Sequence, residues 1–250
     1  MHSPPRDAAW NMALDEAMLR NAARTQAVSI RLYRWERPSV SFGRNQRCAG
    51  IYTGERCDAA GVPAVRRLTG GRALLHGAEL TYCVAAPTAR AQTLRGGYEA
   101  INALLISALA LLGVHAVRAM PRERTPSPGL APCFDVPSVG ELVVDGRKLV
   151  GSAQHREADA FLQHGSILLD DDQRLLADLT SVPLPAVPTP ATLRGMIGDI
   201  TFEHVADAIE CALRSCPDGQ LVHAADTGLD ANDVQTALTR YRDPRWTWRR

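Results

Sequence analysis

Residues 141–150 read ELVVDGRKLV, and this stretch is the clearest guide to the fold of the chain. Two β-prone runs flank Asp145-Gly146, a dipeptide that the two-residue type I′ turn favours. The backbone twist of that turn matches the twist of the strands it joins, so it connects neighbouring antiparallel strands. The stretch therefore predicts a β-hairpin, and with it a sheet that contains antiparallel pairs.

Further strands are expected around this hairpin. Residues 28–33, VSIRLY, alternate apolar and polar side chains as a half-buried strand does, and residues 161–169 form another apolar run. Shorter strands are expected at residues 40–42, 62–67, 74–76 and 80–86. Strands outnumber helices and follow one another along the chain. The sequence therefore predicts an α+β fold, with packed helices on a mixed, largely antiparallel sheet, rather than alternating βαβ units.

Apolar residues at helical spacing predict the helices, which are expected over residues 7–24, 48–61, 94–112, 201–216 and 232–242. In the first of these, Asp15 and Glu16 are expected on the polar side, away from the apolar stripe. The elements run on without a repeat or a low-complexity tract. One catalytic domain is expected over residues 1–250, with a helical C-terminal extension at about residues 200–250.

The composition excludes several classes of protein. Lys and Arg number 28 against 27 Asp and Glu, and 46% of residues are hydrophobic. Such a balance argues against a nucleic-acid partner, and the hydrophobic content is that of an ordinary globular protein. The most apolar segment, residues 103–112, is too short to cross a bilayer. No apolar stretch follows a basic start at the N-terminus, so we expect a cytoplasmic protein that does not bind membranes.

Six cysteines stand at positions 48, 57, 83, 133, 211 and 216. They are too sparse for a disulfide scaffold, and their spacing is not that of a metal site. We expect reduced thiols and no bound metal.

A glycine-rich segment, RRLTGGRALLH at residues 66–76, is the first candidate for chemistry. Adjacent glycines let backbone N–H groups approach an anionic or carbonyl oxygen, and Arg66, Arg67 and Arg72 add charge for a carboxylate or phosphate. No Gly-Lys-Ser/Thr follows, so the segment is not a P-loop. An equally open interpretation is a plain hairpin turn, with paired strands and surface arginines on either side of Gly70-Gly71.

Cys133 and Lys148 form the second candidate. A lysine ammonium stabilises a nearby thiolate, and a lysine that has lost its proton could instead act as a base for an attacking amine. The sequence alone leaves both roles open, together with a buried, inert cysteine and a solvated lysine.

Small residues follow Lys148. Gly151, Ser152 and Ala153 could let a substrate chain lie against the backbone, or could simply let strands pack closely. His164 and Gly165 lie in an apolar strand, where they indicate either a core histidine or the close approach of a ligand.

In this order, the segments resemble the biotin/lipoate ligase and acyltransferase superfamily over most of the chain. The resemblance is carried by NMALDEAML, IRLYRWERPSVSFGRNQ, RRLTGGRALLHGAELTY, GRKLVGSAQ, LQHGSILL and YRDPRWTWRR, which start at residues 11, 30, 66, 146, 162 and 241. It implies a ligase-like α+β catalytic domain with a tunnel for an acyl chain. The residues implied to bind substrate are Arg67, Thr69, Gly70, Gly71, Arg72, His76, Gly151, Ser152, Ala153, His164 and Gly165.

One class within this superfamily is especially similar. PCFDVPSVGELVVDGRK, residues 132–148, matches the cysteine motif of octanoyltransferases that use acyl-carrier protein as the acyl donor. The resemblance implies that Cys133 is the nucleophile and that Lys148 lowers the pKa of its thiol. Gly77 and Gly140 depart from the pattern, in which an acidic residue and an aromatic residue, respectively, are common.

The implied reaction belongs to lipoate biosynthesis and has two steps. Cys133 takes an octanoyl group from octanoyl-acyl-carrier protein as a thioester, and a lysine of an apo lipoyl domain then takes it as an amide. No cofactor is expected. The expected partners are acyl-carrier protein and apo lipoyl domains, such as the glycine cleavage H protein and the acyltransferase subunits of 2-oxoacid dehydrogenases. Both partners are expected to be acidic, and Arg66, Arg67 and Arg72 are the local basic cluster expected to attract them.

Four alternatives stay open. An ATP-dependent lipoate or biotin ligase would use the same glycine turn and lysine with ATP and Mg²⁺. A near relative would move octanoate from one lipoyl domain to another. A non-catalytic protein would only bind the acyl chain, and a cysteine hydrolase would use Cys133 with His164.

Overall fold

The structure, a computed structural model, describes residues 3–91, 93–120, 140–184, 189–216 and 228–249. Its strands are β1 Ser29–Tyr33, β2 Ser39–Phe42, β3 Ala64–Arg66, β4 Leu74–His76, β5 Glu79–Pro87, β6 Val117–Arg118, β7 Leu142–Val144, β8 Arg147–Glu157 and β9 Ala160–Leu168. Its helices are α1 Ala8–Thr25, α2 Gly54–Ala59, α3 Thr88–Ala91, α4 Leu94–Leu111, the 3₁₀ helix η1 Gln173–Leu179, α5 Leu193–Ile197, α6 Phe202–Arg214, α7 Ala231–Arg242 and α8 Pro244–Thr247.

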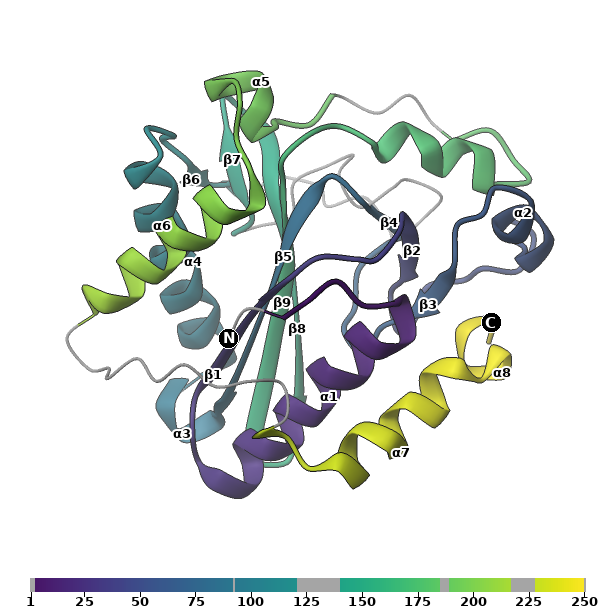
Figure 1. The fold of residues 1–250 in the computed structure, drawn as a ribbon, viewed down its shortest axis with the longest axis horizontal. Helices are drawn as coiled ribbons and strands as arrows, with labels where there is room; N and C mark the ends of the chain where they lie inside the picture. Colours follow the sequence, from purple (N-terminus) through teal and green to yellow (C-terminus); the bar gives the residue numbers. More distant parts are fainter. Residues whose placement is uncertain (1–2, 92, 121–139, 185–188, 217–227, 250) are drawn as a thin grey trace.

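A six-stranded sheet in the order β1-β5-β9-β8-β7-β6 forms the centre of the molecule (Figure 1). All of its neighbouring strands are antiparallel. The predicted hairpin joins β7 to β8, and both turn residues have positive φ, 50° at Asp145 and 73° at Gly146, as a type I′ turn requires. The predicted α+β fold is confirmed.

A second sheet has three strands in the order β3-β2-β4. Strand β2 is parallel to β3 and antiparallel to β4. The strands on either side of Gly70-Gly71 are β3 and β4, and β2 lies between them. The prediction of a hairpin at this turn is therefore wrong, because β3 and β4 each pair with β2 and not with each other.

Helices cover both faces of the large sheet (Figure 1). One hydrophobic core joins a face of the sheet to α4 and α6, and a second core joins the opposite face to α1 and α7. Helices α6 and α7 thus lie on opposite faces of the large sheet. None of the described helices is both long enough and apolar enough to cross a membrane.

Two details of the helices differ from expectation. The helix predicted over residues 48–61 is shorter, because α2 begins only after Thr53, whose side chain caps it. On α1, which Asp7 caps as predicted, Asp15 and Glu16 are 2% and 1% exposed instead of facing water. The reason is that α1 is covered on two sides, by the large sheet and by α7.

Candidate active site

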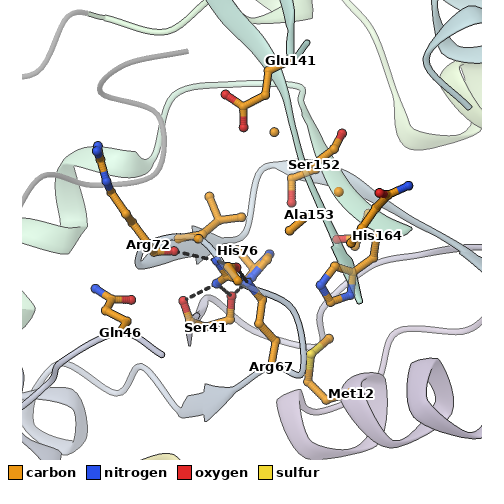
Figure 2. A pocket seen from close by; sticks show the side chains of 18 of the residues that line it. Met12, Ser41, Gln46, Arg67, Arg72, His76, Glu141, Ser152, Ala153 and His164 are labelled. Atoms are coloured by element: carbon orange, nitrogen blue, oxygen red, sulfur yellow. Dashed lines mark hydrogen bonds between the residues drawn. The ribbon is translucent and has the colours of Figure 1, made fainter. Parts of the chain in front are cut away.

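A cavity of about 590 Å³ lies between the two sheets, a volume in the range of small-molecule sites (Figure 2). Of the residues predicted to bind substrate, all except Thr69 line it: Arg67, Gly70, Gly71, Arg72, His76, Gly151, Ser152, Ala153, His164 and Gly165. The structure thus brings together segments that lie far apart in the sequence. Apolar side chains, among them Met12, Trp35 and Leu74, complete much of the wall.

The glycine turn between β3 and β4 forms one side of the cavity. Gly71 has a φ of +95°, a conformation that favours glycine, and the Arg67 guanidinium lies directly beside it. This guanidinium donates hydrogen bonds to the carbonyl oxygens of Ser41, Gly70 and Arg72, at 2.8 to 2.9 Å. Arg67 therefore holds the turn in place.

Arg66 is buried and cannot serve as a surface charge. It donates hydrogen bonds to the carbonyl oxygens of Gly43, Gln46, Thr247 and Arg249, at 2.7 to 2.9 Å. Since Arg66 is 0% exposed and Arg67 5%, the expected basic docking cluster of Arg66, Arg67 and Arg72 is wrong. Guanidinium groups have several donors, and here the first two arginines use theirs on backbone carbonyls.

His76 belongs to a buried polar network on β4. Its Nε2 lies 2.7 Å from Ser41 Oγ, and its Nδ1 lies 2.6 Å from Glu79 Oε1. The imidazole also stacks on Trp35, with ring centroids 3.9 Å apart. These contacts fix the orientation of the ring at the cavity wall.

His164 belongs to a second network of the same kind. Its Nε2 lies 2.7 Å from Thr69 Oγ1, and its Nδ1 lies 2.8 Å from Asp15 Oδ2. Thr69 is fully buried and does not line the cavity, so its hydroxyl anchors the glycine turn to His164.

Asp15 was missed by the sequence prediction, although it lies in a quoted segment. Its carboxylate also accepts hydrogen bonds from Arg31 at 3.1 Å and from the Tyr33 hydroxyl at 2.9 Å. Burial, together with the charge of Asp15, raises the pKa of Tyr33 well above its ordinary value. The only signal for Asp15 in the sequence was a carboxylate next to the apolar stripe of a helix.

Strands β8 and β9 supply the small residues of the wall. Ala153 pairs with His164, and Ser152 pairs with Gly165. A Cβ on Gly165 would collide with the carbonyl oxygen of Gly151 and with the Tyr82 ring. Gly165 is thus needed for the packing of the strands, although it also lines the cavity.

Of the predicted catalytic pair, Cys133 and Lys148, the structure describes only Lys148. Cys133 lies outside the described residues. Lys148 is 2% exposed, and its Nζ lies 2.7 Å from Glu141 Oε1. Lys148 does not line the cavity, whereas Glu141, which the sequence prediction missed, does. Glu141 stands just before the apolar strand that pairs with Lys148, and this placement was the available signal.

The other cysteines are free thiols, and Cys48, Cys57 and Cys83 are buried. Burial raises the pKa of Cys57 to about 11 and that of Cys83 well above its ordinary value. These thiols are therefore poor nucleophiles at neutral pH. Within the described part of the chain, His, Cys, Asp and Glu form no cluster that could hold a metal ion.

The unusual glycine at position 77 has a structural explanation. A Cβ there would collide with Asp172 Oδ2, the atom that accepts a hydrogen bond of 2.8 Å from the Ala78 amide. Asp172 thus places a carboxylate where a side chain at position 77 would begin.

A family model, the lipoyl protein ligase A/B catalytic domain, matches residues 7–214. The chain belongs to this family. It is 34% identical over 268 residues to octanoyltransferase LipM of Kyrpidia tusciae, covering 100% of this chain and 98% of the relative. It is 40% identical over 191 residues to octanoyltransferase LipM of Geobacillus kaustophilus, covering 73% of this chain and 68% of the relative.

Solved structures of this family share the fold. The chain superimposes on P. falciparum LipL1 in complex with lipoate with a TM-score of 0.74, at 19% identity, over 100% of this chain and 73% of the other. It superimposes on lipoate-protein ligase A bound with ATP with a TM-score of 0.74, at 18% identity, over 99% and 96%. At this identity, the likeness concerns the fold alone.

Proposed function

We propose that this protein is an octanoyltransferase of lipoate biosynthesis, which moves an octanoyl group from octanoyl-acyl-carrier protein to a lysine of an apo lipoyl domain. The observation that carries this proposal is the 34% identity with an octanoyltransferase over the whole chain and 98% of that relative. The partly apolar cavity between the sheets supports it, because an eight-carbon chain is bound by apolar side chains.

In the first proposed step, the Cys133 thiolate attacks the carbonyl carbon of the octanoyl thioester. The carbon–sulfur bond to acyl-carrier protein breaks, and a new thioester forms on the enzyme. Lys148 is the proposed partner of this thiolate, because a nearby ammonium favours the charged form of a thiol. The ion pair with Glu141 offsets the cost of burying that ammonium.

In the second proposed step, the lysine of the lipoyl domain attacks the enzyme thioester and forms an amide. Exchange of one thioester for another is nearly balanced in free energy. Amide formation is downhill, because the nitrogen lone pair is delocalised into the carbonyl group. The two steps therefore need no ATP and no cofactor.

Each step passes through a tetrahedral intermediate with an oxyanion. Backbone N–H groups of the turn around Gly70 and Gly71 are suitable donors, because this turn lines the cavity and is held by Arg67. A well-placed donor contributes about 3 kcal/mol to such a transition state.

Omission of ATP tests the proposal against its closest alternative, an ATP-dependent ligase. The purified protein is incubated with octanoyl-acyl-carrier protein and an apo lipoyl domain, and the amide is detected by the mass of the domain. We expect octanoylated domain without ATP. If the amide forms only after ATP and Mg²⁺ are added, the chain is a ligase.

The acyl donor is tested in the same assay. Replacing octanoyl-acyl-carrier protein with an octanoylated lipoyl domain distinguishes the proposed reaction from transfer between lipoyl domains. We expect the initial rate to be higher with acyl-carrier protein, and a higher rate with the octanoylated domain would contradict that donor.

A further inference from the structure

We propose that the opening of the cavity is a docking surface for the donor protein, where Arg44, Arg47 and Arg72 bind the acidic surface of acyl-carrier protein and the phosphodiester of its prosthetic arm. This inference rests on the proposed function, since it names the place where the donor of the first proposed step binds. The experiment below separates a failure of this inference from a failure of the function.

The cavity opens to solvent between two loops. Arg47, in the loop that follows β2, lines the cavity and is exposed, and the same holds for Gly70 and Gly71 of the glycine turn. Arg72 also lines the cavity and is half-buried. Figure 2 shows Gln46, the neighbour of Arg47, on the same side of the cavity as Arg72. A protein that delivers an acyl chain to this cavity therefore meets these two loops.

The cations at this opening add positive charge that no nearby anion neutralises. Arg44, Arg47 and the buried Arg66 form no ion pair with a carboxylate of the described residues. By contrast, the buried Arg31 pairs with Asp15 at 3.1 Å. The opening is therefore electropositive although the whole chain is nearly neutral, and such a local field favours an acidic partner.

The charge of Arg44 already acts on a neighbouring side chain. Its Nη1 lies 3.3 Å from His155 Nδ1. Burial lowers the pKa of His155, and the charge of Arg44 is the next cause, larger than the opposite effect of either Glu157 or Glu16. A positive potential that opposes the protonation of a histidine attracts anions to the same place.

The fold fixes the loop after β2 against the glycine turn. The Arg66 guanidinium donates a hydrogen bond of 2.7 Å to the Gly43 carbonyl, and the Arg44 amide donates one of 2.7 Å to the Thr69 carbonyl. A Cβ on Gly43 would collide with the Gly71 carbonyl oxygen, so the two backbones are in direct contact. The loops that present the arginines are thus held in place before a partner arrives, which lowers the cost of binding.

The chemistry of the donor matches these side chains. Acyl-carrier protein is expected to be acidic, and it carries its acyl group on a phosphopantetheine arm that a phosphodiester joins to the protein. A planar guanidinium group binds the oxygens of phosphates and carboxylates in pairs. When the acyl chain lies in the cavity, the arm passes through the opening and brings these anions toward the arginines. A lipoyl domain is also expected to be acidic, but its lysine carries no phosphate, so the arginines favour the donor.

The test measures kcat/KM for acylation of the enzyme by octanoyl-acyl-carrier protein, followed by intact mass at about 0.02 M and about 0.5 M NaCl. We expect Arg44→Glu and Arg47→Glu each to lower kcat/KM about tenfold at the lower salt concentration. At the higher concentration the loss should be less than about threefold, because salt screens exposed charges. Arg47→Lys keeps the charge and should lose less than Arg47→Glu.

Arg95→Glu is the matched control. The Arg95 side chain is 88% exposed, and its replacement changes the net charge by the same amount as the other two charge reversals. Arg95 lies on α4, on the opposite side of the molecule from β2 (Figure 1). We expect Arg95→Glu to behave as wild type at both salt concentrations.

The second acidic partner is tested by the discharge of preformed octanoyl-enzyme with an apo lipoyl domain. At the lower salt concentration, we expect Arg47→Glu to slow this discharge less than it slows acylation. A larger loss in discharge would show that the opening receives the lipoyl domain, and it would overturn the inference.

Two results of the acylation assay would also overturn it. One is a loss in either Arg44→Glu or Arg47→Glu that is no larger than that in Arg95→Glu. The other is an equal loss at both salt concentrations, which would indicate a change in the cavity instead of weaker attraction of the donor. In both cases the wild type is still acylated, so the proposed function stands. A wild type that octanoyl-acyl-carrier protein does not acylate would instead refute the proposed function.

Discussion

At the scale of single residues, Asp15 connects the first helix to the candidate active site. It lies 149 residues before His164 in the chain, yet the two side chains meet at 2.8 Å. Asp15 also pairs with Arg31, which is 0% exposed, so this carboxylate compensates a buried cation. Removing this carboxylate leaves the buried Arg31 guanidinium without the charge that compensates it.

Asp15→Asn is therefore expected to lower the free energy of unfolding by about 3 kcal/mol, measured by urea denaturation. Asp233→Asn is the matched control, because Asp233 pairs with Arg24, whose side chain is 50% exposed. Exposed pairs contribute less than about 1 kcal/mol. An equal effect of the two substitutions would contradict the role assigned to Asp15.

The residues of the site were predictable from the sequence to different degrees. The glycine turn, His76 and His164 were found because their segments are distinctive in themselves. Asp15 and Glu141 were missed, because their importance depends on partners that only the folded chain brings close. Lys148 was found as a residue, but its burial against Glu141 was not foreseen.

At the scale of elements, the sequence predicted the pairing at one turn and not at the other. The Asp145-Gly146 turn fixes its hairpin through backbone angles alone, so the sequence was sufficient there. At Gly70-Gly71, the pairing depends on β2, a strand from an earlier part of the chain. No property of the turn itself indicates that a third strand enters between its neighbours.

Gly77→Ala tests the packing of the loop between β4 and β5. The added Cβ would meet Asp172 Oδ2, which must then move and give up its hydrogen bond to the Ala78 amide, so we expect a loss of about 1 kcal/mol in the free energy of unfolding. In an Asp172→Ala background the same substitution should cost much less, because the space is then open. Equal costs in both backgrounds, measured by urea denaturation, would exclude this contact.

The Asp172 carboxylate should also make the stability of the protein depend on pH. Burial, and to a lesser degree the charge of Glu79, raises the pKa of Asp172 above its ordinary value of 3.8. The folded state therefore disfavours the ionised form, and the contribution of Asp172 to stability falls as the pH rises from below 3.8 through the raised pKa. Relative to wild type, Asp172→Asn should gain stability over that interval in thermal melts. If the difference in melting temperature between Asp172→Asn and wild type does not change with pH, the pKa of Asp172 is not raised.

At the scale of the whole molecule, the C-terminal segment is joined to the rim of the cavity. Arg66 donates hydrogen bonds to Thr247 and Arg249 on one side and to Gly43 and Gln46 on the other. Gln46 lines the cavity, and the Trp248 ring lies 5.5 Å from that of Phe42. The segment lies beyond the family match, which ends at residue 214.

Removing residues 244–250 should therefore hold Arg66, and with it Gln46 at the edge of the cavity, less firmly. We expect the melting temperature to fall, because Arg66 loses its hydrogen bonds with Trp246, Thr247 and Arg249, and we expect KM for octanoyl-acyl-carrier protein to rise about tenfold. Trp246→Phe removes the 2.7 Å bond to the Arg66 carbonyl but keeps an aromatic ring, and should have a smaller effect on both quantities. Unchanged melting temperature and KM in the truncated protein would show that the segment does not support the rim.

The most direct test of the proposed function is the intact mass of the protein after exposure to octanoyl-acyl-carrier protein without ATP. We predict one added octanoyl group per chain, removed by hydroxylamine and mapped to Cys133 by peptide sequencing. Cys133→Ser should lose this adduct, whereas Cys57→Ser should keep it, because burial raises the pKa of Cys57 to about 11. An adduct on another residue, or none without ATP, would contradict a thioester intermediate at Cys133.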